Sequence, residues 1–472
     1  MLKKLFRRKF IQHIIEDLDI EQHRLQRSLN AFDLTILGIG AIIGVGIFVL
    51  TGAAAAKYAG PGVILSFIIS GVACTFAALC YAELASSIPV AGSAYNYAYA
   101  TMGELIAWII GWDLILEYIV ACIAVAIGWS GYFVSILAAV GINVPVWCSA
   151  APGTVPGAII NLPAILIVVF LSAILVVGIK ESARFTSVMV FIKLLTVLVF
   201  IGVGMSHVNP ANWIPFMPFG LKGVVAGAAI VFFAYIGFDA VSTAAEETRN
   251  PQKNMPIGIL LSLGICTILY IIVAAVLTGM VSYKDLNTPA PVAHAMTLVG
   301  FRWGSAIVSA GAVAGITSVL LVMLMGQPRI FFAMSRDGLL WPWMGKVHPR
   351  FRTPYVAQII TGFVVATFAG FVDIGTAAEL CNIGTLFAFA IVCGGVVVLR
   401  YTHPELKRTF RCPMVPLIPL LGVGFCICLM LFLPKITWVR FALWLLAGLG
   451  IYFYYGIRHS RMAHKREEPP VK

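Results

Sequence analysis

The sequence predicts an all-α integral membrane protein with twelve transmembrane helices. Of its 472 residues, 60% are hydrophobic and only 11% are charged, whereas soluble proteins carry about 25% charged residues. Apolar stretches of about 18 or more residues recur along the whole chain, as expected for helices that cross a bilayer. The net charge of +12 is concentrated in short segments between these stretches. This composition excludes a water-soluble enzyme, a nucleic-acid-binding protein and a disordered scaffold.

Each predicted helix corresponds to one apolar window. The windows are long and do not alternate between apolar and polar residues, so a closed β-barrel is excluded. From the N-terminus, the windows are 33–56, 63–87, 102–128, 161–179, 185–206, 223–243, 256–280, 303–333, 355–372, 376–399, 414–433 and 437–457.

Lysine and arginine are distributed unevenly between the two sides of this predicted bundle. The N-terminal segment and the alternate segments after it hold 24 of these residues, and the opposite loops hold only six. Because cytoplasmic loops carry the excess of basic residues, we expect a multi-pass protein of the cell membrane with both termini in the cytoplasm. The start of the chain is basic and then polar, unlike a signal peptide. Residues 1–32 are therefore predicted as a cytoplasmic segment and 458–472 as a cytoplasmic tail.

The ten cysteines do not predict a disulfide framework or a metal site. Eight of them lie inside apolar windows, and no spacing of Cys and His suggests zinc. The chain also lacks a nucleophile elbow. We therefore expect no cofactor, no metal ion and no enzymatic activity.

Two windows contain features that weaken a helix. The first holds GIGAIIGVG at 38–46, with four glycines, and each glycine destabilises a helix by about 1 kcal/mol relative to alanine. The sixth holds FFAYIGFDAVS at 232–242, with Gly237 in its middle. Broken helices five spans apart are typical of inverted repeats. For the first window, close packing of small residues against a neighbouring helix is the alternative.

A broken helix in mid-membrane offers the backbone groups that a zwitterion needs. Amide N–H groups at the start of one half-helix meet a carboxylate, and carbonyls at the end of the other meet an ammonium group. Small residues suit such an opening because the backbone itself makes the contacts. The candidate binding residues are Ile42, Ile43, Gly44, Val45 and Gly46 in the first window, and Phe233, Ala234, Tyr235 and Ile236 in the sixth.

Ionisable residues inside the predicted helices are a second functional signal. Lys193 lies nine residues after Arg184, which at 1.5 Å per residue places it about 13 Å into a core about 30 Å thick. A lysine at that depth must pair, become neutral or move protons. Glu117 is also deep, with Asp113 one turn earlier. The alternatives are a structural Lys193–Glu117 ion pair and a coupling role for Lys193.

Three other acidic residues are expected to have local roles. Glu83 and Glu104 lie near the predicted cytoplasmic ends of their helices, and we expect them at the membrane interface. Asp239 leads into a predicted cytoplasmic loop, where a polar contact at a helix end or at a gate is a better expectation than substrate binding.

Six segments of the sequence resemble the amino acid–polyamine–organocation superfamily, and within it the cationic amino acid transporter group in its shorter bacterial form. The resemblance extends from about residue 30 to residue 460, and the stretch 232–259 is long and specific. The segments are GIGAIIGVGIFVLTG (38–52), AGPGVILSF (59–67), YAELASSIPVAGSAYNYAYATMGELIAWIIGWDLILEY (81–118), FFAYIGFDAVSTAAEETRNPQKNMPIGI (232–259), MSRDGLL (334–340) and CNIGTLFAFAIV (381–392).

This resemblance implies the leucine-transporter fold, with a five-helix repeat over 33–206, an inverted five-helix repeat over 223–399 and two further helices over 414–457. It implies a secondary transporter of amino acids, often driven by protons, that binds substrate at the two breaks. Lys193 matches the family lysine that occupies the place of an ion in sodium-driven relatives. The hydroxyl of Thr317 or of Ser318 would face it.

One departure from the family pattern concerns the substrate. Animal relatives that carry arginine have a small polar residue where this chain has Met323, so the resemblance implies neutral L-amino acids such as alanine. Glu117 would lie across the pocket from Met323. We therefore predict an amino acid importer driven by proton symport, with a small-molecule substrate, protons and the bilayer as its partners.

Other functions remain as alternatives. Within transport, they are exchange of amino acids without protons and transport of cationic amino acids. A membrane sensor is disfavoured because the termini carry no signalling domain, and a pore because the midplane features suggest a binding site rather than rings of like residues. No protein partner is inferable.

Overall fold

The computed structural model describes Arg7 and residues 28–88, 93–177, 183–351, 353–406 and 408–464. Within these residues the protein is helical and has no β-strand, only isolated bridges from Leu29 to Thr248 and from Ser149 to Asn161. The predicted all-α class is confirmed. Most of the predicted N-terminal segment, 1–6 and 8–27, and residues 465–472 of the predicted tail lie outside the described residues.

Eight helical segments among the described residues are long and apolar enough to cross a membrane. A bilayer core about 30 Å thick needs about 20 residues of helix, and every one of these segments approaches or exceeds that length. They are Gly46–Ser87, Glu104–Ala139, Ser187–Met205, Gly220–Ala245, Pro251–Met280, Trp303–Arg336, Ile374–Thr402 and Lys435–His459.

Four further apolar helices are shorter, with 10–17 residues each. Every apolar window of the sequence overlaps one of the long segments or one of these short helices. The short helices are α3 (Ala31–Ile42), α8 (Leu162–Val177), α14 (Tyr355–Phe371) and α16 (Leu417–Leu431).

The remaining helices fall within the long segments or connect them. The longer ones are α5 (Val63–Ser87), α7 (Glu104–Ala139), α9 (Ala183–Met205), α10 (Gly220–Val231), α11 (Pro251–Met280), α13 (Arg302–Arg336), α15 (Ile374–Thr402) and α17 (Lys435–Ile451). The shorter ones are α4 (Thr51–Ala54), α6 (Ser93–Thr101), α12 (Pro291–Leu298), α18 (Ile457–His459) and α19 (Arg461–His464).

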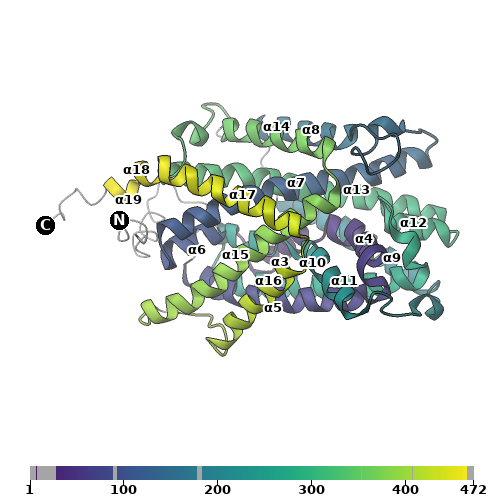
Figure 1. Ribbon diagram of the computed structural model, residues 1–472, viewed down its shortest axis with the longest axis horizontal. Coiled ribbons are helices and arrows are strands. Elements are labelled where there is room, and N and C mark those ends of the chain that lie inside the picture. The colour runs from purple at the N-terminus through teal and green to yellow at the C-terminus, as the bar shows by residue number, and fades with distance from the viewer. Residues whose placement is uncertain are drawn as a thin grey trace.

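Helix α7 runs through the bundle and packs along α13 (Figure 1). Glycines bring the two helices close together. A Cβ added at Gly326 of α13 would lie 2.4 Å from Cε1 of Tyr118, and one added at Gly111 of α7 would lie 2.7 Å from Sδ of Met334. Small residues at such crossings let helices approach closely in a membrane, where dispersion drives their packing. Helices α8 and α14 pair along one edge of the bundle (Figure 1).

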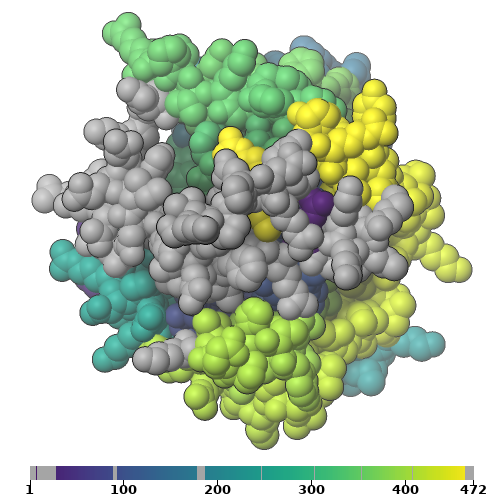
Figure 2. All heavy atoms as spheres, turned by 90° about the vertical axis from the view of Figure 1, so that its left-hand side faces the viewer, coloured from purple at the N-terminus to yellow at the C-terminus, as the bar shows by residue number. Residues whose placement is uncertain are grey.

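The described parts of the two chain ends meet at one end of α7. The backbone N–H of Glu104 donates to the carbonyl of Arg7 at 2.9 Å, and the hydroxyl of Ser460 donates to Oε2 of Glu104 at 2.6 Å. Tyr99 and Tyr452 also donate to this carboxylate, at 3.1 and 3.0 Å. Figure 2 looks onto this end, where the loop after α15 and the C-terminal helices form part of the rim.

Glu83 and Glu104 lie at helix ends, as expected, four residues before the end of α5 and at the start of α7, and both side chains are fully buried in the protein. Glu83 accepts two hydrogen bonds from Arg400, at 2.9 and 2.7 Å, and one from the backbone N–H of Cys412 at 2.7 Å. Arg408 lies 3.3 Å from the same carboxylate. Burial is tolerated because each carboxylate is paired or hydrogen-bonded.

Candidate functional site

The first predicted break interrupts the chain after α3. The helix ends at Ile42, and Ile43 has an extended backbone with ψ of 106°. Helical backbone resumes at Val45 and continues as a π-helix over Gly46–Leu50. Two glycines of the cluster, Gly44 and Gly46, therefore flank the point at which the chain re-enters a helix.

The second predicted break lies in the segment Gly220–Ala245. Helix α10 passes into a 3₁₀ turn, Phe232–Tyr235, and Ile236 is extended with ψ of 133°. Gly237 has φ of +119°, a backbone conformation that L side chains rarely adopt. A second 3₁₀ stretch, Asp239–Glu247, follows it. The side chain of Asp239 accepts the N–H of Gly237 at 3.2 Å, the helix-end contact that the sequence predicted.

The two breaks touch each other. A Cβ added at Gly46 would lie 2.2 Å from the Cα of Ala234, and one added at Gly237 would lie 2.8 Å from the carbonyl oxygen of Ala41. Glycine at both positions is what allows the backbones to come this close. The structure thus brings together the predicted residues of the first and sixth windows.

The carbonyls at the end of α3 have partners outside the helix. The last carbonyls of a helix lack intrahelical donors, and here Gly40 accepts the ammonium of Lys193 at 2.5 Å. The carbonyl of Ile42 lies 2.9 Å from the hydroxyl of Tyr270 on α11, and the same hydroxyl lies 2.9 Å from the carbonyl of Ala234. One tyrosine therefore contacts the backbone of both breaks.

Sequence reasoning missed Tyr270, and also Asn382 on α15. The Asn382 side-chain amide donates to the carbonyls of Ala229 and Ile230, at 2.7 and 3.1 Å, near the end of α10. The sequence feature that could have pointed to them is a hydrogen-bonding side chain inside an apolar stretch, because such a group must find a partner within the bundle. Both residues use the protein's own carbonyls as those partners.

Lys193 is fully buried on α9. Its ammonium contacts the end of α3 through Gly40, and its stem packs against α13, where a Cβ added at Gly315 would lie 2.7 Å from the lysine Cγ. Lys193 therefore contacts both the first break and α13. Among the described side chains it forms no ion pair with Glu117.

Thr317 and Ser318 lie on α13, within one turn of the glycine that packs on Lys193. The hydroxyl of Thr317 donates to Val313 of its own helix at 2.7 Å and accepts the indole N–H of Trp129 at 2.8 Å. The hydroxyl of Ser318 donates to the carbonyl of Gly315 at 2.9 Å. In this structure both hydroxyls therefore donate to carbonyls of their own helix and not toward the Lys193 ammonium.

Glu117 lies on α7 among acidic and polar groups. It is 3% exposed, its side chain is within hydrogen-bonding reach of the Thr385 hydroxyl, and Asp239 and Asp113 are close enough to interact with it electrostatically. Its backbone carbonyl accepts the thiol of Cys381 at 3.6 Å. Glu117 is therefore beside the segment that follows the second break.

Met323 and Phe233 are both buried. The first break faces the same helix as Met323, because a Cβ added at Gly44 would lie 3.1 Å from Cγ2 of Val319, and residues four apart on a helix share a face. Val319 and Met323 thus form an apolar face of α13 beside the first break.

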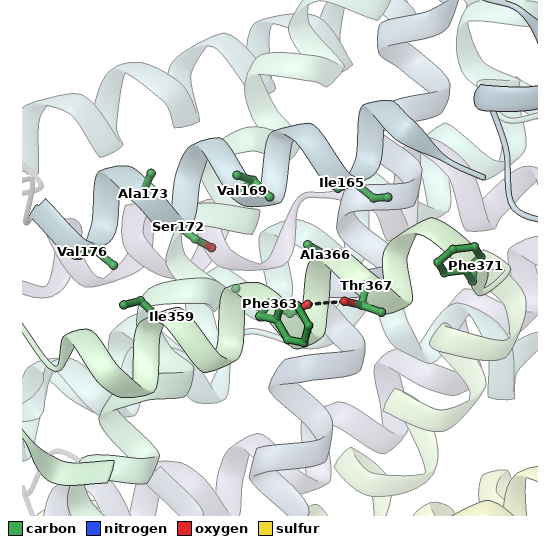
Figure 3. Close-up of a pocket in the computed structure, with 11 residues that line it drawn as sticks. Ile165, Val169, Ser172, Ala173, Val176, Ile359, Phe363, Ala366, Thr367 and Phe371 are labelled. Carbon is green, nitrogen blue, oxygen red and sulfur yellow. Dashed lines mark hydrogen bonds between the residues drawn. The ribbon is translucent and has the colours of Figure 1, made fainter. Parts of the chain in front are cut away.

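The structure has a cavity of about 480 Å³ whose lining includes no residue of either break (Figure 3). It is a groove between α8 and α14, and none of the predicted site residues lines it. At the breaks, Ile42, Ile43 and Val45 are at most 3% exposed. The candidate site is therefore closed in this conformation.

The sequence is similar to known transporters over nearly its whole length. Residues 29–453 match a family model described as amino acid permease. The chain is 52% identical over 465 residues to the branched-chain amino acid permease BcaP of Bacillus subtilis (strain 168), covering 98% of this chain and 100% of that protein. It is 51% identical over 459 residues to the methylthioribose transporter of the same organism, covering 97% and 99%.

A more distant relative belongs to the group that the sequence motifs indicated. The chain is 39% identical over 412 residues to the vacuolar cationic amino acid transporter 4 of Arabidopsis thaliana, covering 86% of this chain and 68% of that protein. These relatives are all named as transporters or permeases. With its long apolar helices, the protein is a multi-pass membrane permease, and the chain belongs to the amino acid permease family.

Proposed function

We propose that the protein imports neutral L-amino acids, such as alanine, by proton symport. The observation that carries this proposal is the contact between the two breaks, with Tyr270 between the carbonyls of Ile42 and Ala234. Amides at the start of the half-helix after Gly44 would bind the substrate carboxylate, and carbonyls at the ends of α3 and of the 3₁₀ turn would bind its ammonium group. The remaining predicted contacts come from Ile43, Val45, Gly46, Phe233 and Ile236.

The apolar face of α13 supports a neutral substrate. A guanidinium beside Met323 and Val319 would lose hydration without gaining a hydrogen bond. Two relatives more than 50% identical are named for branched-chain amino acids and for methylthioribose, and neither name designates a cationic amino acid. We propose that Glu117 lies on the opposite side of the pocket.

Lys193 supports the proton-coupled part of the proposal. In its charged form it holds the carbonyl of Gly40 at the end of α3. Loss of the proton would release this end of the helix, and the two states would then differ in which side of the membrane the site faces. We keep the hydroxyls of Thr317 and Ser318 as candidate partners of the ammonium, because they lie within one turn of Gly315, which packs on the lysine stem.

We also propose twelve spans in two inverted repeats, 33–206 and 223–399, followed by two helices over 414–457. Support comes from the position of the interruptions, since each lies in the first helix of its repeat. In this count α3 and the first part of Gly46–Ser87 together form span one, α5 is span two, and α8, α14 and α16 are spans of their own.

We further propose that both termini are cytoplasmic, on the distribution of lysine and arginine. Ile142→Cys and Lys253→Cys place a thiol at exposed positions in opposite predicted loops. In intact cells, a membrane-impermeant maleimide is expected to label the first variant and to label the second only after permeabilisation. Labelling of the Lys253→Cys variant in intact cells would show that the proposed orientation is wrong.

The transport proposal is tested with the purified protein in liposomes. Uptake is measured for alanine, valine, leucine, isoleucine, arginine and methylthioribose, each with and without an inward proton gradient. We expect accumulation of neutral amino acids that depends on the gradient. Counterflow that is indifferent to pH would instead indicate an exchanger, and uptake restricted to arginine would indicate a cationic transporter. Uptake of methylthioribose alone would overturn the substrate class.

Met323→Ser is expected to raise the uptake of arginine relative to alanine by about tenfold. The smaller polar side chain would open room and offer a hydrogen bond worth roughly 1 kcal/mol or more. Competition of labelled alanine uptake by arginine measures the change. Met325→Ser, on the same helix but a different face, is the matched control and should leave the ratio unchanged. Tight arginine binding by the unmutated protein would contradict the selectivity argument.

A further inference from the structure

Asp113 is a fully buried carboxyl on α7 that lacks hydrogen-bond partners. It lies nine residues into the helix, so about 14 Å from the Glu104 end. Both of its oxygens are buried without a partner. A Cβ added at Gly384 would lie 2.7 Å from Oδ1, so the carboxyl faces the bare backbone of α15. A negative charge at this position would have nothing to stabilise it.

The other buried carboxylates on the same side of the bundle are satisfied. Glu83 is paired with arginine, Glu104 accepts three hydroxyls, and Asp337 accepts the hydroxyl of Tyr95 at 2.7 Å. Among the residues that the structure describes, the two oxygens of Asp113 are the only buried carboxylate oxygens without a partner. The other carboxylates show that burial on this side of the bundle normally comes with hydrogen-bond partners. A neutral, protonated carboxyl explains why Asp113 is buried without them.

Acidic groups connect Asp113 to the second break. Glu117 lies one turn further along α7, where it meets Thr385, the residue next to Gly384 on α15. Asp239, which caps the N–H of Gly237, is the neighbour of Glu117 on the other side.

The titratable and charged groups around this pair come from four elements. They are Asp239 after the break, the thiol of Cys381 on α15, and Tyr118 on α7, which lies near Arg329 of α13. No group of three or more His, Cys, Asp or Glu among the described side chains is arranged to hold a metal ion. A proton is the ligand that would satisfy the buried, partnerless oxygens of Asp113, because it removes the charge.

We propose that Asp113 is a second proton-binding site, separate from Lys193. Asp113 holds its proton while α7 packs on α15. It releases the proton through Glu117 when the segment after the second break moves. In the release step the O–H bond of Asp113 breaks, the proton passes to the Glu117 carboxylate and then to water, and a hydrated Asp113 carboxylate remains. The inference rests on the proposed transport function. It adds a protonatable group on the side of the second break to Lys193, which contacts the first.

Infrared difference spectra of the purified protein test the site without substrate. The protein is labelled with ¹³C-aspartate, and spectra are taken across a pH titration. We expect a protonated-aspartate C=O band that titrates in the unmutated protein, is absent in Asp113→Asn and persists in Glu104→Gln. Asparagine has the shape of a protonated aspartate, and Glu104→Gln is the matched control because this carboxyl lies on the same helix but has three hydroxyl donors.

Transport separates a proton site from a structural carboxyl. In liposomes, Asp113→Asn is expected to lose most of the pH dependence of alanine counterflow, Asp113→Glu to recover it in part, and Glu104→Gln to keep the normal profile. A normal pH profile in Asp113→Asn, or an aspartate band that never titrates in the unmutated protein, would make Asp113 a permanently protonated structural group. If Asp113→Asn does not fold, Asp113→Glu makes the assignment instead, because it removes the band of residue 113 from the ¹³C-aspartate signal.

These outcomes are distinguishable from failure of the transport proposal. If the unmutated protein does not move amino acids, the proposed function is wrong. The infrared titration, which needs no substrate, then still reports whether Asp113 exchanges its proton, through the band that disappears in Asp113→Asn or Asp113→Glu.

Discussion

Gly46→Leu is expected to abolish amino acid binding while the protein still inserts into the membrane. The new side chain would begin 2.2 Å from the Cα of Ala234, a backbone atom that cannot rotate away. The breaks would have to separate, and overpacking of this kind costs about 3 kcal/mol, or roughly a hundredfold in affinity. Leucine also favours a continuous helix over the opening. Binding of labelled alanine to the purified variant, with its elution profile as the check on folding, measures the effect.

The glycines of the chain supply a graded comparison for this prediction. Gly264→Leu on α11 is the control, because a Cβ there meets nothing within 4 Å. Gly44→Leu should lie between the two, since its Cβ would meet only the Val319 side chain, at 3.1 Å. If a folded Gly46→Leu protein bound alanine with full affinity, the two breaks could not be the binding site.

Lys193→Ala is expected to retain substrate binding and lose the acceleration of uptake by an inward proton gradient. The alanine cannot hold the carbonyl of Gly40, so protonation no longer changes how firmly the end of α3 is fixed. We expect gradient-driven accumulation to fall by about tenfold or more, equivalent to at least 1.4 kcal/mol of lost coupling. Lys222→Ala, at an exposed position, is the control.

The binding measurement decides how a loss of transport in Lys193→Ala is understood. Loss of both alanine binding and transport would indicate that the lysine holds the site together. Accumulation against a gradient with normal pH dependence would place the coupling group elsewhere.

The sequence predicted those features that depend on local composition. Long apolar windows predict membrane helices because the bilayer offers the backbone no other partner, and the observed helices overlap every window. Four glycines between residues 38 and 46 predict a weak helix, and the structure interrupts the helix after Ile42. A lone lysine in an apolar window must find an acceptor inside the protein, and Lys193 finds the carbonyl of Gly40.

Features that depend on which helices meet were beyond the sequence. Nothing in the spacing of residues shows that Tyr270 reaches both breaks, or that Thr317 and Ser318 turn to acceptors on their own helix. The burial of Glu104 depends on a hydroxyl from Ser460, which is far away along the chain. Such contacts arise from tertiary packing and leave no periodic pattern in the sequence.

The hydroxyl of Tyr270 carries a single hydrogen but faces two carbonyls at equal distances of 2.9 Å. Its one hydrogen can point directly at only one of them at a time, so the carbonyl of either Ile42 or Ala234 is left without the tyrosine as its donor. An arriving cationic group would therefore find an acceptor in whichever half-helix the tyrosine has left. Rotation about the C–O bond of the tyrosine moves its hydrogen bond from one carbonyl to the other, without any movement of the backbone.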